Sequence, residues 1–249
     1  DVLNLTGNLL VSSPSASVPG VDAGGGHIVL TTDLIQINAD LRSWYLGMAG
    51  GNDAARGTLV LQSLNALQSI GVGLGAVGVF QLDNNELDHI INGFGRTAVD
   101  RFDGITVGRA DGRHKVEIGT YAFRDSVTIR APQVPGGIHV VGLLSTVGNA
   151  TIHFIGSFHT TVLDNDVYTN GDDKLFADSV IIGEGKDITI STGPLGGDVT
   201  ITGRLDGVAD GAGGTAGAPE SLTILAGTGN VLIQGDIGGI EPLENLTII

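Results

Sequence analysis

The chain has 249 residues, and 41% of them are hydrophobic, which is sufficient for a continuous buried core. The formal net charge of −15 argues against nucleic acid as a partner, because phosphate binding requires clustered lysine and arginine. Cysteine is absent, which excludes disulfides, thiolate metal sites and a cysteine nucleophile. No apolar run approaches the roughly 20 residues needed to span a bilayer, so membrane insertion is not expected.

Short runs rich in Val, Ile, Thr and Leu recur along the chain, and many of the 41 glycines separate them. Before the last third, the predicted strands are His27–Thr32, Leu34–Asn38, Thr58–Gln62, Gly78–Leu82, Ile105–Val107, Lys115–Ile118, Ser126–Arg130, Ile138–Val141, Thr151–Ile155 and Val180–Ile182. Many alternate between apolar and polar residues. One face of each strand is therefore expected to be buried and the other to face solvent.

One helix is predicted, over Asn84–Gly93. Asp83 is a suitable N-cap and Glu86 stands where a capping box places a glutamate. Apolar residues follow at helical spacing, at Leu87, Ile90, Ile91 and Phe94. Such a helix is expected to lie on the flank of the fold or to cover a break in it.

The glycines Gly73, Gly75 and Gly78 satisfy the pattern G-x-G-x-x-G. A dinucleotide site would require a helix to begin there, but the strand-like sequence VFQL follows, so a turn is predicted. The stretch 41–56 contains GMAGGND and is predicted to be a loop insertion.

The last third of the chain repeats itself. Lys186–Gly207 and Glu220–Gly239 share one order of strands and glycine turns, and a third copy begins at Glu244. Ile188, Leu222 and Leu246 occupy matching positions, spaced by 34 and then 24 residues, and the excess falls in the Gly/Ala/Asp-rich stretch 208–219. A repeat of about 24 residues is typical of a stacked array.

Strands this close together leave no room for crossover helices, so each strand is expected to pair in parallel with its equivalent one coil away. The predicted fold is all-β, a right-handed parallel β-helix (β-solenoid) with one short flanking helix and extruded loops. Coils are predicted over residues 1–82 and 104–249, joined by the helix and a linker at 83–103, with further loops at 160–178 and 207–219. Threonines 189, 200 and 223 are predicted to face outward.

The segment GTGNVLIQGDIGGIEPLENLTI resembles units of giant bacterial surface proteins of the filamentous-haemagglutinin and autotransporter-adhesin type. The matching positions are Thr228, Gly229, Val231, Gly235, Ile237, Gly238, Gly239, Leu243, Leu246 and Thr247. Residues 81–108 resemble a helix-bearing stretch of the same proteins. The resemblance implies a parallel β-helix stalk and an exported location, secreted or at the cell surface. Because the chain stops inside a copy of the repeat, we expect it to be a piece of something larger.

The most acidic stretch contains six oxygen-bearing side chains: Asp164, Asp166, Asn170, Asp172, Asp173 and Asp178. Carboxylates and carbonyls on a flexible loop suit Ca²⁺, and the first five of these residues form the candidate calcium site. EF-hand spacing fails, because Tyr168 and Thr169 stand at its fifth and sixth positions, and the glycine-rich calcium-binding nonapeptide is absent. A solvated loop is therefore the favoured interpretation, and the calcium site is the alternative.

Among the histidines, none has metalloprotease spacing. His139 and His153 alternate with apolar neighbours, so both are predicted to face outward. They are read as surface residues, and a shared metal site is the alternative.

The function predicted is non-catalytic: a stiff acidic stalk or filament in a large secreted protein that mediates contact at the cell surface. Its expected partners are other copies or flanking solenoid segments, end to end, and a host surface, a neighbouring cell surface or a polysaccharide. Neither a catalytic residue nor a cofactor other than Ca²⁺ is predicted. The alternative is a carbohydrate-active β-helix enzyme, a polysaccharide lyase or hydrolase with Ca²⁺ as its candidate cofactor and Lys174 or Arg130 as the candidate base beside the acidic stretch.

Overall fold

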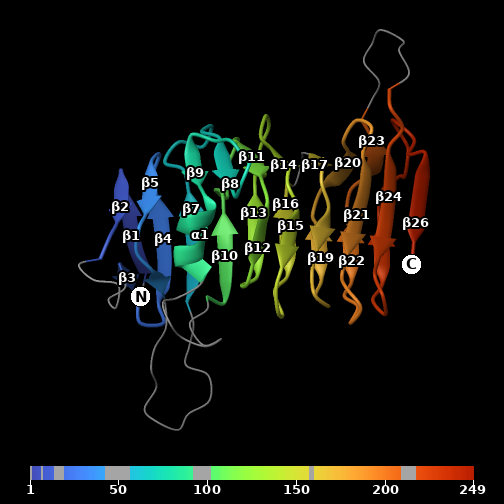
Figure 1. Cartoon of the computed structure of the whole chain (residues 1–249). Helices are drawn as coiled ribbons and strands as arrows, with labels where there is room; N and C mark the ends of the chain where they lie inside the picture. The colour runs from blue at the N-terminus through green and yellow to red at the C-terminus, as the bar shows by residue number, and fades with distance from the viewer. Residues whose placement is uncertain are drawn as a thin grey trace.

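The structure is a computed structural model that describes residues 2–6, 8–13, 20–42, 57–91, 102–156, 160–208 and 217–249. In these ranges the chain forms short strands that pair in parallel, together with the helix α1 (Asn84–Ile91) (Figure 1). The strands stack in order from the N-terminal to the C-terminal end of the molecule, and the two termini lie toward opposite ends (Figure 1). Among the described residues, no helix is both long and apolar enough to cross a membrane.

Three large sheets run along the molecule. Within the described ranges, the first sheet has nine strands in the order β1 (Val2–Thr6), β4 (His27–Thr31), β7 (Thr58–Gln62), β10 (Gly104–Val107), β13 (Val127–Arg130), β16 (Ile152–Ile155), β19 (Lys174–Phe176), β22 (Val199–Ile201) and β25 (Val231–Ile233). Over the same residues, the second has seven, β9 (Phe80–Leu82), β8 (Ile70–Val72), β11 (Lys115–Ile118), β14 (Gly137–Val140), β17 (Thr160–Leu163), β20 (Ser179–Ile182) and β23 (Leu205–Gly207). The third, counted in the same way, has six, β12 (Tyr121–Phe123), β15 (Leu144–Thr146), β18 (Val167–Tyr168), β21 (Asp187–Ser191), β24 (Ser221–Leu225) and β26 (Asn245–Ile248).

Two short pairs of strands complete the N-terminal end. They are β2 (Leu9–Val11) with β5 (Ile35–Ile37), and β3 (Val21–Asp22) with β6 (Leu41–Arg42).

From β10 to β24 the chain visits the first, second and third sheets in turn. We call one such set of three strands a coil. Each strand pairs with the equivalent strand of the next coil, so paired positions on the first sheet are separated by 22 or 25 residues between Ile105 and Val199. The mostly β structure and its long parallel sheets are compatible with a parallel β-helix.

The register predicted from the repeat is confirmed. Ile188 pairs with Leu222, and Leu222 pairs with Leu246. On the first sheet Val199 pairs with Val231 across 32 residues, because residues 208–219 are inserted between these two coils. Every strand predicted before the last third is also present, with ends that differ by at most two residues.

The core consists of columns of apolar side chains that follow the pairing register. On the first sheet one column contains Ile28, Leu59, Ile105, Val127 and Ile152, each at most 2% exposed. Burial of such a side chain contributes roughly 1.5–3 kcal/mol, so the columns supply the main stabilisation of the stack.

The neighbouring column of the first sheet contains Phe154 and Phe176, whose rings stack 4.7 Å apart at an interplanar angle of 11°. Outward positions of the strands are more exposed than these columns. Thr189, Thr200 and Thr223 are partly exposed on the outer face, as predicted.

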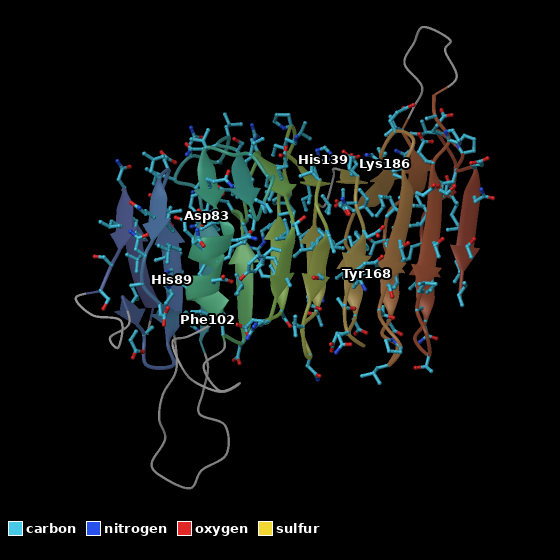
Figure 2. All side chains as sticks on the ribbon, in the orientation of Figure 1. Asp83, His89, Phe102, His139, Tyr168 and Lys186 are labelled. Carbon is cyan, nitrogen blue, oxygen red and sulfur yellow. The ribbon has the colours of Figure 1, made fainter. Side chains whose placement is uncertain are left out.

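Helix α1 begins with the predicted capping box. The Glu86 amide donates to Asp83 Oδ1 at 2.9 Å, and the Asp83 amide donates to Glu86 Oε2 at 3.0 Å. Glu86 Oε1 also accepts from the Ile37 amide at 3.1 Å, which ties the helix to β5. Asp83 and His89 both lie at α1 (Figure 2). His89 Nδ1 is 2.9 Å from Asp40 Oδ1.

The helix takes a place that a strand holds in later coils. It packs against β5 and β6 on one side, and the Tyr121 hydroxyl of β12 donates to Asp88 Oδ1 on the other at 3.0 Å. Before it, β8 and β9 pair in parallel with each other, joined by the turn that holds Gly73 and Gly75. Both glycines have positive φ, 86° and 90°, so the turn predicted there is confirmed.

The predicted loop at 160–178 is wrong, because β17, β18 and β19 lie within it. In the other predicted insertions, residues 41–42 form β6 and residue 207 ends β23. Positions 43–56, 92–101 and 209–216, including the predicted end of the helix at Gly93, lie outside the described residues.

Candidate functional site

The five residues of the candidate calcium site lie in one coil, at two places. Asp164 and Asp166 lie between β17 and β18, while Asn170, Asp172 and Asp173 lie between β18 and β19. Asp164 Oδ2 is 2.7 Å from His139 Nε2 on β14, and the Tyr168 hydroxyl donates to Asp166 Oδ2 at 2.8 Å.

Several acidic and hydroxyl side chains bind backbone one coil further along. Asp173 Oδ1 accepts from the Asp198 amide at 2.8 Å, and Asp198 Oδ1 accepts from the Asn230 amide at 2.7 Å. Asp166 Oδ1 accepts in the same way from the Thr189 amide at 2.7 Å. We call these side-chain acceptors corner oxygens, because they lie between strands, where the backbone ladder is interrupted.

Corner oxygens are therefore one structural use of the acidic residues. Among the described residues, no three His, Asp or Glu side chains are grouped so that they could hold a metal ion. The Asp172 carboxylate has one buried oxygen without a hydrogen-bond partner, and burial raises its pKa. The calcium site stays a prediction, and the hydrogen bonds of Asp166 and Asp173 show what else these carboxylates do.

His139 and His153 lie on different sheets. His139 belongs to β14 in the second sheet and His153 to β16 in the first, and both are partly exposed at outward positions of their strands. Burial lowers the pKa of His153. The prediction that both face outward is confirmed.

Lys174 occupies a core column, although its chemistry is that of a surface residue. It pairs with Ile152 on one side and Val199 on the other, and it is 1% exposed. Its Nζ donates to Thr169 Oγ1 at 2.9 Å and to the Ser191 carbonyl oxygen. Burial lowers its pKa to about 7. A side chain enclosed in this way does not reach a polysaccharide at the surface, so the arrangement does not support Lys174 as a catalytic base.

Asp178 is the second buried ionisable group of the same coil. It is 6% exposed, and its Oδ2 accepts from the Thr161 hydroxyl at 2.8 Å. Its Oδ1 is buried without a hydrogen-bond partner. Burial raises the pKa of Asp178 to about 7, because a carboxylate loses more hydration than the neutral acid.

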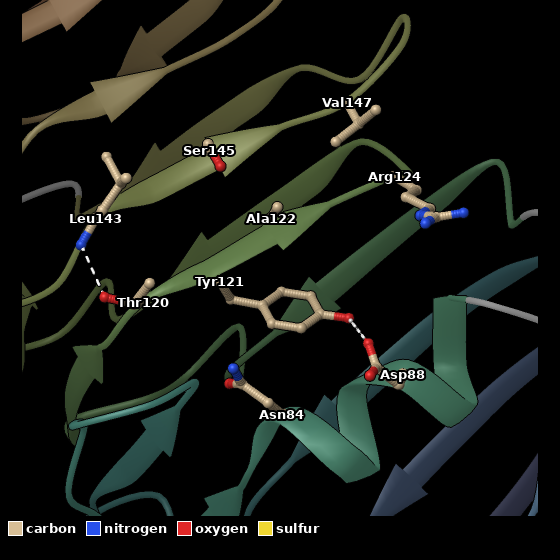
Figure 3. Close-up of a pocket in the computed structure, with 9 residues that line it drawn as sticks. All are labelled: Asn84, Asp88, Thr120, Tyr121, Ala122, Arg124, Leu143, Ser145 and Val147. Atoms are coloured by element: carbon tan, nitrogen blue, oxygen red, sulfur yellow. Dashed lines mark hydrogen bonds between the residues drawn. The ribbon is translucent and has the colours of Figure 1, made fainter.

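An open groove of about 430 Å³ lies between α1 and the third sheet (Figure 3). It is lined by Asn84, Asp88, Thr120, Tyr121, Ala122, Arg124, Leu143, Ser145 and Val147. Its volume is within the range of small-molecule sites, about 300–1,000 Å³.

The groove has both polar and apolar walls. Asp88 contributes a carboxylate on the helix side, which accepts from the Tyr121 hydroxyl, and Arg124 contributes a guanidinium on the sheet side (Figure 3). Burial, followed by the nearby Asp88, raises the pKa of Tyr121, so its hydroxyl stays a hydrogen-bond donor. Leu143 and Val147 are exposed at 37% and 49%. A ligand here would meet one charge of each sign and an apolar edge.

Local sequence patterns do not indicate this groove, because its residues come from helix α1 and from the two successive coils that contain β12 and β15. Comparison with protein-family models, with curated proteins and with solved structures finds no match for this chain.

Proposed function

We propose that this chain is a non-catalytic structural or adhesive segment of a large secreted or cell-surface protein. In this proposal it folds as a right-handed parallel β-helix and acts as a stiff acidic stalk. The observation that carries the proposal is the first sheet, which extends in one register from β1 to β25. Each coil then contacts chiefly its neighbours, as in other stacked repeats.

Stiffness follows from the direction of the bonds. Backbone hydrogen bonds between parallel strands run along the stack, and strands lie about 4.8 Å apart. Bending the rod would open the ladder on one side and would separate the apolar columns. Acidic residues keep the outside hydrated, and the loops and the groove beside α1 offer places for contact with a cell surface or a polysaccharide.

Two measurements test the proposal. Small-angle X-ray scattering should give an elongated particle whose long axis includes a stack of about 40 Å, from eight spacings of about 4.8 Å. Antibodies raised against the chain should label intact cells of the source organism without permeabilisation. A spherical particle would contradict the stalk, and labelling that requires permeabilisation would contradict the surface location.

A carbohydrate-active enzyme is the second candidate, and the groove is the observation that favours it, since Asp88 and Arg124 line it together. Arg130, the other base candidate, ends β13, and its carbonyl oxygen lies 3.1 Å from His114 Nε2. Acidic polysaccharides incubated with the chain, with and without a chelator, decide between the candidates. Turnover that is lost in Asp88→Asn would favour the enzyme over the stalk.

A further inference from the structure

We propose that the groove beside α1 binds an extended peptide segment of a partner protein, which adds as an antiparallel strand to the free edge of β12. The peptide carries an acidic side chain two residues before an aromatic one. This inference rests on the proposed role in surface contact and names the class of partner that the groove recognises.

Strand β12 forms an edge of the third sheet, although it lies in the middle of the chain. Among the described strands, β15 pairs with it on one side and none pairs with it on the other, where α1 takes the place of a strand. Unpaired edges of this kind are templates for strand addition. This edge results from the helix and not from the ends of the stack.

The backbone of Ala122 points away from β15. In a parallel pair, alternate residues of a strand bond to the same neighbour. The Tyr121 amide donates to the Leu143 carbonyl oxygen, and the Phe123 carbonyl oxygen accepts from the Val147 amide. Ala122 stands between these two residues, so its N–H and C=O are directed to the side of α1, where it lines the groove. An extended peptide supplies the matching acceptor and donor.

The chain itself uses the same edge two residues earlier. Thr120 forms an antiparallel bridge with Leu74, in which the Thr120 amide donates to the Leu74 carbonyl oxygen at 2.8 Å and the Leu74 amide donates back at 3.2 Å. A peptide opposite Ala122 continues this pairing in the same direction. One of its residues then exchanges both hydrogen bonds with Ala122, as Leu74 does with Thr120.

Helix α1 supplies the opposite wall of the groove. Asn84 and Asp88 lie on the helix side and face β12 (Figure 3). Among the described residues, no donor reaches the buried Asn84 Oδ1, and such an acceptor is costly to leave unsatisfied. In a peptide paired with Ala122, the next N–H along points to α1, so the peptide has a donor for Asn84.

The charge of the groove favours an acidic side chain in the peptide. Arg124 lines the groove two residues after Ala122, and in the described part of the chain its guanidinium forms no ion pair. In an antiparallel peptide, the residue opposite Arg124 comes two positions before the residue opposite Ala122. Opposite charges at such facing positions attract, so a carboxylate is expected there.

The floor of the groove favours a large apolar side chain. Ala122 and Ser145 pair with each other on the outer face of the sheet, and both are small. The exposed side chains of Leu143 and Val147 flank them (Figure 3). An aromatic ring on the peptide residue opposite Ala122 lies over this floor and covers the two apolar side chains.

NMR titration of the whole ¹⁵N-labelled chain tests the site. The probe is a blocked pentapeptide with glutamate at its second position, phenylalanine at its fourth and threonine elsewhere. It should shift the Ala122 amide resonance downfield and slow the hydrogen exchange of this amide, because the amide gains an acceptor. Arg124→Glu should weaken binding about tenfold. Arg113→Glu is the matched control: it makes the same charge change at an exposed residue outside the groove and should leave binding unchanged.

A second peptide separates main-chain pairing from side-chain attraction. It has the same sequence with an N-methyl group on the phenylalanine amide. All side chains are kept, but the donor for the Ala122 carbonyl oxygen is lost, so the affinity should fall about tenfold.

Three results would overturn the inference: no change at Ala122 when the pentapeptide is added, equal affinity of the N-methylated peptide, or shifts in the groove with oligogalacturonate and none with the peptide. The last result would assign the groove to a saccharide. Failure of peptide binding would leave the stalk and its surface location to the scattering and labelling experiments. Labelling that requires permeabilisation would contradict the surface role while peptide binding stays measurable, so the two failures are distinguishable.

Discussion

Replacement of Asp178 by asparagine should change how the stability of this protein depends on pH. Asp178 lies between β19 and β20, is 6% exposed and has a pKa of about 7 against an ordinary value of 3.8. Because the folded-state pKa is raised, the native state holds a proton that the unfolded chain releases. The contribution of Asp178 to the free energy of unfolding is fully present below pH 4 and is lost as the pH rises toward 7.

The magnitude follows from the difference between the two pKa values. About three pH units at 1.36 kcal/mol each give up to ~4 kcal/mol at pH 8, an upper value because a buried carboxylate relaxes its surroundings. Asp178→Asn has no charge to bury and keeps an oxygen for the Thr161 hydroxyl. The variant should match wild type near pH 4 and exceed it at pH 8, with a thermal midpoint higher by roughly 10 °C.

Denaturant unfolding of both chains at intervals from pH 3.5 to 8.5 measures this difference directly. Subtracting the free energies of unfolding of the two chains at each pH cancels the general effect of the −15 net charge. Thr161→Val supplies a matched perturbation: it removes the hydrogen bond that favours the carboxylate, so the loss of stability should extend to higher pH. A difference between Asp178→Asn and wild type that is constant over this range would refute the reasoning.

The remaining predictions concern the other buried groups and the acidic stretch. Lys174→Met should stabilise the protein more at pH 6 than at pH 10.5. The pKa of Lys174 is about 7 in the folded chain and 10.5 ordinarily, so unfolding takes up a proton between pH 7 and 10.5 and the wild-type chain gains stability over that range. Urea midpoints of both chains at pH 6 and 10.5 measure the difference, and equal gains at the two pH values would contradict the prediction. Glu86→Ala should cost about 1–2 kcal/mol and raise hydrogen exchange in α1. Glu86→Gln keeps one of the two acceptor oxygens and should lose less protection; equal loss in both would show that the acceptor oxygens are not what matters. Removal of Ca²⁺ by EDTA should leave the thermal midpoint unchanged, because Asp166 and Asp173 bind backbone amides; a drop that added Ca²⁺ reverses would instead support the calcium site.

The parts of the fold that follow apolar periodicity could be predicted from the sequence. The DITIS and SLTIL strands alternate regularly, and aligning them was sufficient to give the pairing of Ile188 with Leu222. The helix could be predicted because its capping box and its apolar face are both local. Its position beside β5 and β12 could not, because it depends on contacts across 49 and 33 residues.

Strands β17 to β19 were predicted as a loop because polar residues occupy inward positions of β17 and β19. Thr161 and Lys174 stand where other coils have isoleucine or valine, so the alternation that marks a strand is broken in β17 and β19. The hydroxyl and ammonium groups find partners only when coils are stacked: Asp178 lies 17 residues from Thr161, and Ser191 lies 17 residues from Lys174. Hydropathy alone does not show such compensation.

The acidic composition has a structural explanation that local sequence does not reveal. Asp173 and Asp198 occupy equivalent corners of successive coils, and each carboxylate binds the amide at the next corner. Two carboxylates about 4.8 Å apart repel each other, but charge-assisted hydrogen bonds to backbone amides offset this cost and satisfy donors that the strand ladder leaves unpaired. A short side chain is required, because the oxygen must reach an amide one strand spacing away. At the next corner Asn230 donates through its neutral side-chain amide to Asp198 Oδ1 at 3.1 Å, so this corner adds a donor without a third charge.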